Sequence, residues 1–170
     1  GGLSRIAEVA SKIVPFMVMI YLLSGLFIVL SNATLIPSIF SNIFSSAFNG
    51  SSVAGGFAGT AIVISQGFRR AAFSNEAGMG TEVMAIGASK NNQPIKSGLV
   101  AMIGPLIDTI IVCTITGLVI LLSSDWIEGT YSGVSLTQKS FSNYLGLAGD
   151  YILIFSVATF TLSTMFGYSY

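Results

Sequence analysis

The chain has 170 residues, of which 52% are hydrophobic and only 8% are charged, with seven basic and seven acidic side chains. Soluble domains carry about 25% charged residues, so this composition predicts a membrane protein. The balanced charge excludes the basic surface that binding to nucleic acid requires, and we expect no nucleic-acid partner. With no histidine and a single cysteine, the chain offers no disulfide framework, metal cluster or nucleophile–base pair, so we do not expect an enzyme.

The first predicted membrane span covers residues 13–30, which carry no charge. Its length is close to the roughly 20 residues that cross the hydrocarbon layer. Pro15 lies near its first turn, where a missing N–H matters least. Residues 1–12 form an amphipathic pattern, which predicts a short separate helix at the membrane surface.

Residues 36–48 have apolar side chains at helical spacing with serines opposite, and this segment is too short to span. One interpretation is an amphipathic helix on the outer surface of the membrane. The other is the first half of a span that breaks at Gly55 and Gly56. We favour the first, because the second would move the polar break near residues 74–80 into the cytoplasm.

A second span is predicted from about 53 to 89, interrupted near residues 74–80 by polar residues and by Gly78 and Gly80. In lipid, a broken helix is tolerated only where its free backbone groups face protein or a water-filled cavity. Discontinuous helices build the substrate and ion sites of many transporters, so this break predicts a binding site. The alternative is that the glycines only allow close helix packing.

A third span is predicted over residues 97–122, with a loop from there to about Ser142 and a last span over 151–168. Asp108 lies within the third span, where a bare charge costs at least about 2.5–3.5 kcal/mol. We therefore expect it to pair with Arg70, to bind an ion or to relay protons. In the last span, Phe160, Ser163 and Thr164 have i, i+3, i+4 spacing, which places them on one helix face. Hydroxyls that bond back to their own helix are the ordinary alternative.

Basic residues collect in alternate connections of the chain. Arg5, Lys12, Lys90 and Lys96 lie in the first and third connections, whereas Asp125, Glu128 and Lys139 follow the third span. Because cytoplasmic loops are richer in Lys and Arg, residues 1–12 and 90–96 are predicted to be inside. We expect a multi-pass protein of the cytoplasmic membrane, with the lipid bilayer as its surroundings.

The run Phe73-Ser74-Asn75-Glu76-Ala77-Gly78-Met79-Gly80 strongly resembles a signature of the alanine or glycine:cation symporter family, also called the sodium:alanine symporter family. Val14-Pro15-Phe16-Met17, Ile107-Asp108-Thr109 and Gly167-Tyr168-Ser169-Tyr170 resemble further blocks of that family. The chain departs from the usual pattern where Ala71, in place of glycine, follows Arg70. This change bears on substrate preference more than on transport.

The resemblance implies an all-α transporter of the amino acid–polyamine–organocation (APC) superfamily with the LeuT-type five-plus-five inverted repeat. This chain would hold about core helices five to eight, with a broken sixth helix, and its partners would be the missing N- and C-terminal parts of the same protein. The implied function is sodium-coupled symport of small neutral amino acids, alanine or glycine, by alternating access. One alternative is a transporter of the same fold with another small substrate or with proton coupling. The other is a non-transporting membrane scaffold or channel fragment.

The resemblance also implies roles for single residues. The implied substrate-binding residues are Phe73, Ser74, Asn75, Ala77, Gly78 and Tyr168. The implied ligands of the coupling ion, Na⁺, are Ser74, Asp108, Phe160, Ser163 and Thr164. Oxygen atoms are the ligands that a hard cation prefers.

Overall fold

The computed structural model describes residues 3–48, 56–74 and 93–168, and it describes side chains over 12–47, 61–72 and 93–165. Every element in these ranges is helical, as the sequence predicts. Among the described residues, three helical stretches are long and apolar enough to cross a membrane: Lys12–Ser31, Pro94–Ser123 and Leu147–Met165. The chain divides into two compact units, one formed by Gly1–Ala33 with Thr114–Tyr170 and the other by Thr34–Cys113.

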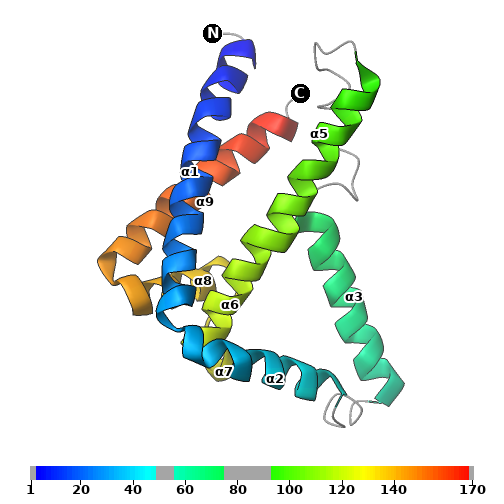
Figure 1. The fold of residues 1–170 in the computed structure, drawn as a ribbon, viewed down its shortest axis with the longest axis vertical. Coiled ribbons are helices and arrows are strands. Elements are labelled where there is room, and N and C mark those ends of the chain that lie inside the picture. The colour runs from blue at the N-terminus through cyan, green and yellow to red at the C-terminus, as the bar shows by residue number, and fades with distance from the viewer. Residues whose placement is uncertain (1–2, 49–55, 75–92, 169–170) are drawn as a thin grey trace. The chain divides into compact units, whose positions relative to one another are not determined.

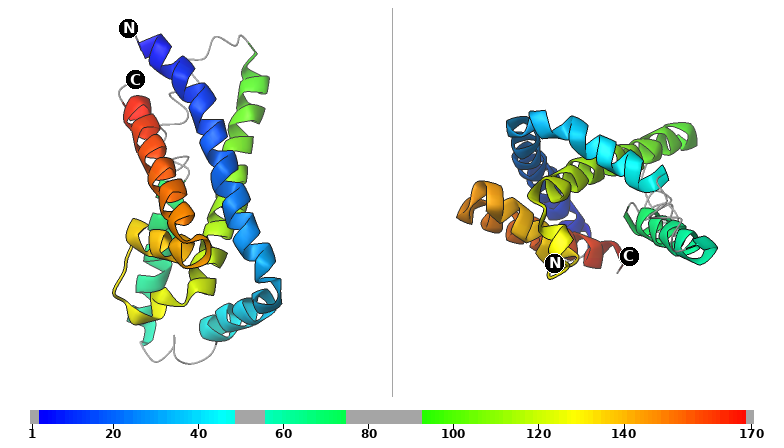
Figure 2. Two further views of the ribbon diagram at one scale, coloured as in Figure 1. Left: turned by 90° about the vertical axis from the view of Figure 1, so that its left-hand side faces the viewer. Right: turned by 90° about the horizontal axis from the view of Figure 1, so that it is seen from below.

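The first unit is built on two long helices, α1 (Leu3–Ser31) and α9 (Leu147–Tyr168). They lie side by side and run in opposite directions (Figures 1 and 2). The unit also contains most of α6 (Cys113–Ser123), the short α7 (Asp125–Glu128) and α8 (Val134–Leu145), which contacts α7 and α9. Its buried apolar side chains come from four of these helices: Met17, Ile28, Val29, Val119, Leu122, Phe141 and Leu153.

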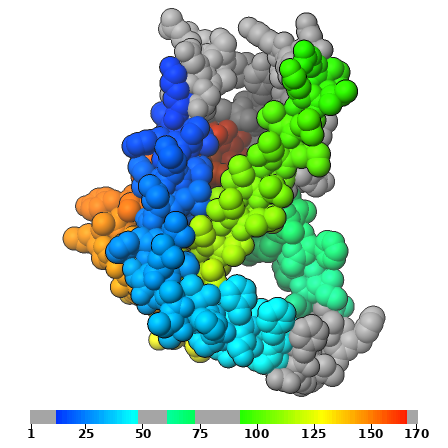
Figure 3. Space-filling model, viewed as in Figure 1, coloured from blue at the N-terminus to red at the C-terminus, as the bar shows by residue number. Residues whose placement is uncertain are grey.

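One side of α1 is open along its length in the space-filling view (Figure 3). Large apolar side chains of this helix are exposed, among them Phe16, Leu23 and Phe27. Burying such side chains away from water is favourable by about 1.5–3 kcal/mol each, so this surface fits contact with lipid or with other transmembrane helices.

The second unit contains the 3₁₀ turn Ala33–Leu35 from Thr34 on, α2 (Ile36–Phe48), α3 (Gly56–Ser74), α5 (Pro94–Leu106) and η2 (Ile107–Val112). α2 covers the residues of the predicted amphipathic helix, and its position on the outer surface stays a prediction. The span predicted over 53–89 is described only as α3, which is not one of the three candidate spans. α3 contacts η2.

The structure corrects several predicted boundaries. Residues 3–12 are not a separate surface helix but the beginning of α1, because Pro15 lies inside the helix without ending it. The third span begins at Pro94 instead of residue 97, since proline suits a first helical turn. The last helix begins at Leu147 instead of 151, and Asp150 in its first turn interacts favourably with the helix dipole.

The predicted loop up to Ser142 is also wrong, since it contains α7 and α8. The sequence of α8 is polar over most of its length, so its helical pattern is weak. Its one fully buried apolar side chain, Phe141, gains its partners only from other helices. Tertiary packing supplies most of the stability of a short helix, which is why sequence alone missed this one.

Candidate functional site

The predicted helix break lies mostly outside the described residues. Phe73 and Ser74 are the last described residues of α3, and only their backbone is described. Asn75, Ala77 and Gly78 lie outside the described ranges. The substrate site predicted from these residues therefore stays a prediction, as does the role of Ser74 in binding sodium.

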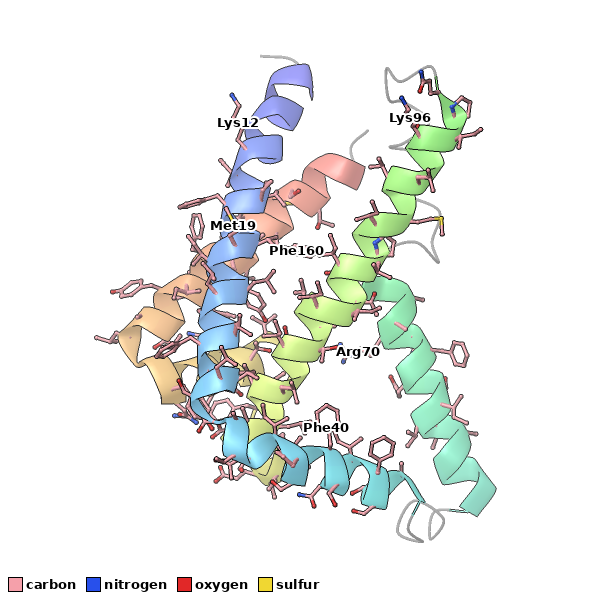
Figure 4. All side chains as sticks on the ribbon, in the orientation of Figure 1. Lys12, Met19, Phe40, Arg70, Lys96 and Phe160 are labelled. Carbon is pink, nitrogen blue, oxygen red and sulfur yellow. The ribbon has the colours of Figure 1, made fainter. Side chains whose placement is uncertain are left out.

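The C-terminal part of α3 carries the two arginines that stood out in an apolar segment. Arg69 and Arg70 are both exposed within the second unit. In Figure 4 the Arg70 side chain leaves α3 on the side that faces the helix containing η2. α3 also contacts η2, which carries Asp108. A pair between Arg70 and Asp108 remains a prediction.

Asp108 lies in a π-helical segment, which the sequence did not predict. In η2 the N–H of Cys113 donates to the carbonyl of Asp108, five residues earlier. The Asp108 side chain is half-buried. π-helical turns are rare and are frequent at functional sites. The one feature of the local sequence that indicates this π-helical segment is Pro105 inside the preceding helix, since proline removes a backbone hydrogen-bond donor.

The predicted sodium ligands Phe160, Ser163 and Thr164 belong to one uninterrupted helix, α9, so they share a helix face. Phe160, marked in Figure 4, is 56% exposed, and the two hydroxyl residues are half-buried. Among the described residues, neither hydroxyl forms a hydrogen bond. Ser156, two turns earlier, differs because its Oγ donates to the Ile152 carbonyl at 2.7 Å.

The remaining predicted residue on α9 is Tyr168, which ends the helix and whose side chain is not described. Asp108 belongs to the other compact unit. In the part of the chain that the structure describes, no group of three or more His, Cys, Asp or Glu side chains could hold a metal ion. Around Ser163 and Thr164, α9 offers hydroxyl and carbonyl oxygens as ion ligands.

Sequence reasoning missed a set of polar contacts around α8. Tyr21 Oη of α1 and Thr116 Oγ1 of α6 share a hydrogen bond of 2.6 Å. Asp150 of α9 accepts hydrogen bonds from Gln138 Nε2 and Ser142 Oγ, both at 3.1 Å. The only sequence signal for these contacts was an acidic residue at the start of an apolar helix.

Tyr144 lies at the end of α8 and donates from Oη to the carbonyl of Leu122 at 2.9 Å. Burial raises the pKa of this phenol above its usual value near 10, and the negative charge of Asp125 raises it further. The phenol is therefore a stable neutral donor at physiological pH. It holds the end of α8 against the end of α6.

Residues 1–170 match the sequence model of the sodium:alanine symporter family. The chain belongs to this family. It is 41% identical over 169 residues to "Uncharacterized transporter YflA" of Bacillus subtilis, covering 97% of this chain and 36% of that protein. It is 42% identical over 173 residues to "Sodium/alanine symporter AgcS" of Methanococcus maripaludis, covering 100% of this chain and 38% of the relative.

A third relative is "Probable sodium/glutamine symporter GlnT" of Bacillus subtilis, 36% identical over 170 residues that cover 100% of this chain and 35% of the relative. The chain thus spans a little more than a third of the length of these relatives. The family consists of transporters and not of enzymes. Together with the apolar helices of this chain, the family match shows that the chain is part of a membrane protein.

Proposed function

We propose that the chain is part of a symporter that carries a small neutral amino acid, alanine or glycine, together with sodium across the cytoplasmic membrane by alternating access. The observation that carries this proposal is the family match over all 170 residues. The printed name of the relative from Methanococcus maripaludis, a sodium/alanine symporter, supports the choice of amino acid and ion.

The geometry of α9 supports a sodium site formed by the Phe160 carbonyl and the hydroxyls of Ser163 and Thr164. Within the described residues these hydroxyls do not bond back to their own helix, whereas that of Ser156 does. Hydroxyl oxygens that make no bond of their own are ligands of the kind that a hard cation prefers. Ser74 and Asp108 are each proposed separately as a ligand of the coupling ion.

For the amino acid, the proposed site is the helix break that follows α3. Phe73, Ser74, Asn75, Ala77 and Gly78 would contact the zwitterion, with half-helix ends and bare backbone groups matching its two charges. Tyr168 is proposed as a further substrate-binding residue. This arrangement presumes the LeuT-type inverted repeat, with the chain holding about core helices five to eight and completed by other parts of the same protein.

A second candidate is a transporter of the same family with proton coupling or another substrate. The half-buried Asp108 in a π-helical turn favours proton coupling, because ionisable residues inside membrane spans often mark ion or proton pathways. The relative named a sodium/glutamine symporter favours a larger amino acid.

The test is uptake of labelled alanine, glycine and glutamine by the full-length protein in proteoliposomes, with and without an inward sodium gradient. We expect accumulation of alanine or glycine that depends on the sodium gradient. Accumulation driven only by a proton gradient and lost in Asp108→Asn would favour the second candidate. Uptake of glutamine alone would identify glutamine as the substrate in place of alanine or glycine. No transport of any of the three amino acids would contradict the proposal.

A further inference from the structure

Helix α8 lies in the connection between α6 and α9, which is the kind of segment that often serves as a mobile lid in transporters and enzymes. We propose that α8 is instead a fixed part of the first unit and stays attached to α1, α6 and α9 throughout transport. This inference rests on the proposed transport function. It follows from contacts that hold α8 from three directions.

The first contact joins α8 to α1. Phe141 has 0% exposure, and its ring stacks on that of Tyr21 with centroids 5.3 Å apart. Gly25, one turn along α1, allows α6 to approach closely, since a Cβ there would lie only 2.5 Å from Ile115 Cγ2. Tyr21 in turn shares the 2.6 Å hydrogen bond with Thr116. Phe141 therefore sits against a pair of helices that are already bonded to each other.

The second contact joins α8 to the beginning of α9. Asp150 accepts hydrogen bonds from Gln138 and Ser142, one to each carboxylate oxygen. The two backbones also meet closely, because a Cβ on Gly149 would lie only 2.5 Å from the carbonyl oxygen of Phe141. Moving α8 away would leave a half-buried carboxylate without these donors, which is unfavourable.

The third contact joins α8 to the end of α6. Ser140 is fully buried, and its Oγ lies 2.8 Å from the Oγ of Ser123. Tyr144 donates to the Leu122 carbonyl on the same helix. A lid movement would break both bonds and uncover the buried Phe141 ring at once. All of these contacts would have to break in the same movement, so α8 is expected to move with its neighbours as one body.

The closeness of Ser123 and Ser140 provides the test. Their oxygens are 2.8 Å apart, so sulfur atoms in their place can approach the 2.03–2.05 Å of a disulfide with small adjustments. The double variant Ser123→Cys, Ser140→Cys is made in the full-length protein with Cys113 and any other cysteine replaced by alanine. Sodium-driven uptake of alanine is then compared in the oxidised and reduced states, with each single variant as a control.

A fixed α8 predicts that the disulfide forms and that the oxidised protein keeps at least about half of the uptake of the reduced protein, with the same half-saturating sodium concentration. A loss of tenfold or more on oxidation that a reductant restores, with the single variants unaffected, would show that α8 must open and would overturn the proposal. Failure of the disulfide to form would overturn it as well.

A second measurement does not depend on transport. Spin labels at Lys139→Cys on α8 and Leu30→Cys on α1, both exposed positions, report the distance between these helices in the same cysteine-free background. A single distance population, unchanged by sodium and alanine, supports a fixed α8, and a second population contradicts it. If the reduced protein transports nothing, the proposed function fails while these distances still decide the role of α8.

Discussion

The two halves of α9 have similar local structure but different surroundings. In the first half, Gly149, Leu153 and Ser156 are buried, and Asp150 is bonded to α8. In the second half, Phe160 and Leu162 are exposed, and the hydroxyls of Ser163 and Thr164 form no hydrogen bond among the described residues. Polar groups of the first half thus stabilise the fold. In the second half, Ser163 and Thr164 are the residues that we propose to bind the coupling ion.

This difference separates structural polar residues from candidate functional ones within a single helix. A satisfied hydroxyl such as that of Ser156 needs nothing more than its own helix. A half-buried hydroxyl without a partner requires water, another helix or an ion. The following substitutions test whether the two halves differ in this way.

Phe141→Ala should have the largest effect on stability. Removing a fully buried aromatic side chain leaves a cavity between α8 and α1 and is expected to cost about 3–5 kcal/mol. Thermal unfolding of the full-length protein in detergent measures the loss. Tyr151→Ala, at a position that is 71% exposed, serves as the control and should change stability by no more than about 0.5 kcal/mol. Similar losses in both variants would contradict the burial of Phe141 between α8 and α1.

Gly149→Ala should be the next most damaging. The new methyl group would lie 2.5 Å from the Phe141 carbonyl oxygen, and a backbone atom cannot move aside as a flexible side chain can. We expect a loss of about 1–3 kcal/mol in the same unfolding experiment. Gly117→Ala on α6 is the matched control, because nothing lies within 4 Å of its added methyl group. It should be neutral or stabilise its helix by up to about 1 kcal/mol.

The double change Ser163→Ala, Thr164→Val tests the second half of α9. Removing two ion ligands should raise the sodium concentration for half-maximal uptake by about tenfold, equivalent to about 1.4 kcal/mol. The control is Ser156→Ala, whose hydroxyl already bonds to the Ile152 carbonyl and should not affect sodium. Unchanged sodium dependence in the double variant would remove the proposed ion site from α9.

Tyr144→Phe should have the smallest effect. At neutral pH the loss of its bond to Leu122 is expected to cost about 0.5–1.5 kcal/mol. Because the pKa of Tyr144 is raised in the folded chain, its contribution is complete below pH 10 and is lost as the pH rises through the raised value. The unfolding temperature should therefore fall less between pH 9 and 11 in Tyr144→Phe than in the parent. An equal fall would show that this phenol does not contribute.

Three of the four predicted apolar spans and the shared face of Phe160, Ser163 and Thr164 were predictable, because length, hydrophobicity and a period of 3.6 residues are properties of local sequence. The boundaries of the helices were harder to predict from the sequence. Residues 3–12 were predicted as a helix of their own because their charges set them apart from the uncharged span, whereas they continue into α1. Helix α8 was missed because its sequence is mostly polar and its one fully buried apolar side chain is Phe141.

The sequence by itself determined that this is an all-helical membrane protein, which family it belongs to, and which residues are candidates for binding. Only the tertiary structure decided that α8 exists as a helix held between α1, α6 and α9. It also decided which serine on α9 is satisfied by its own backbone. The physical reason is that helix formation and membrane insertion depend on neighbours in the chain, whereas burial and hydrogen-bond satisfaction depend on neighbours in space.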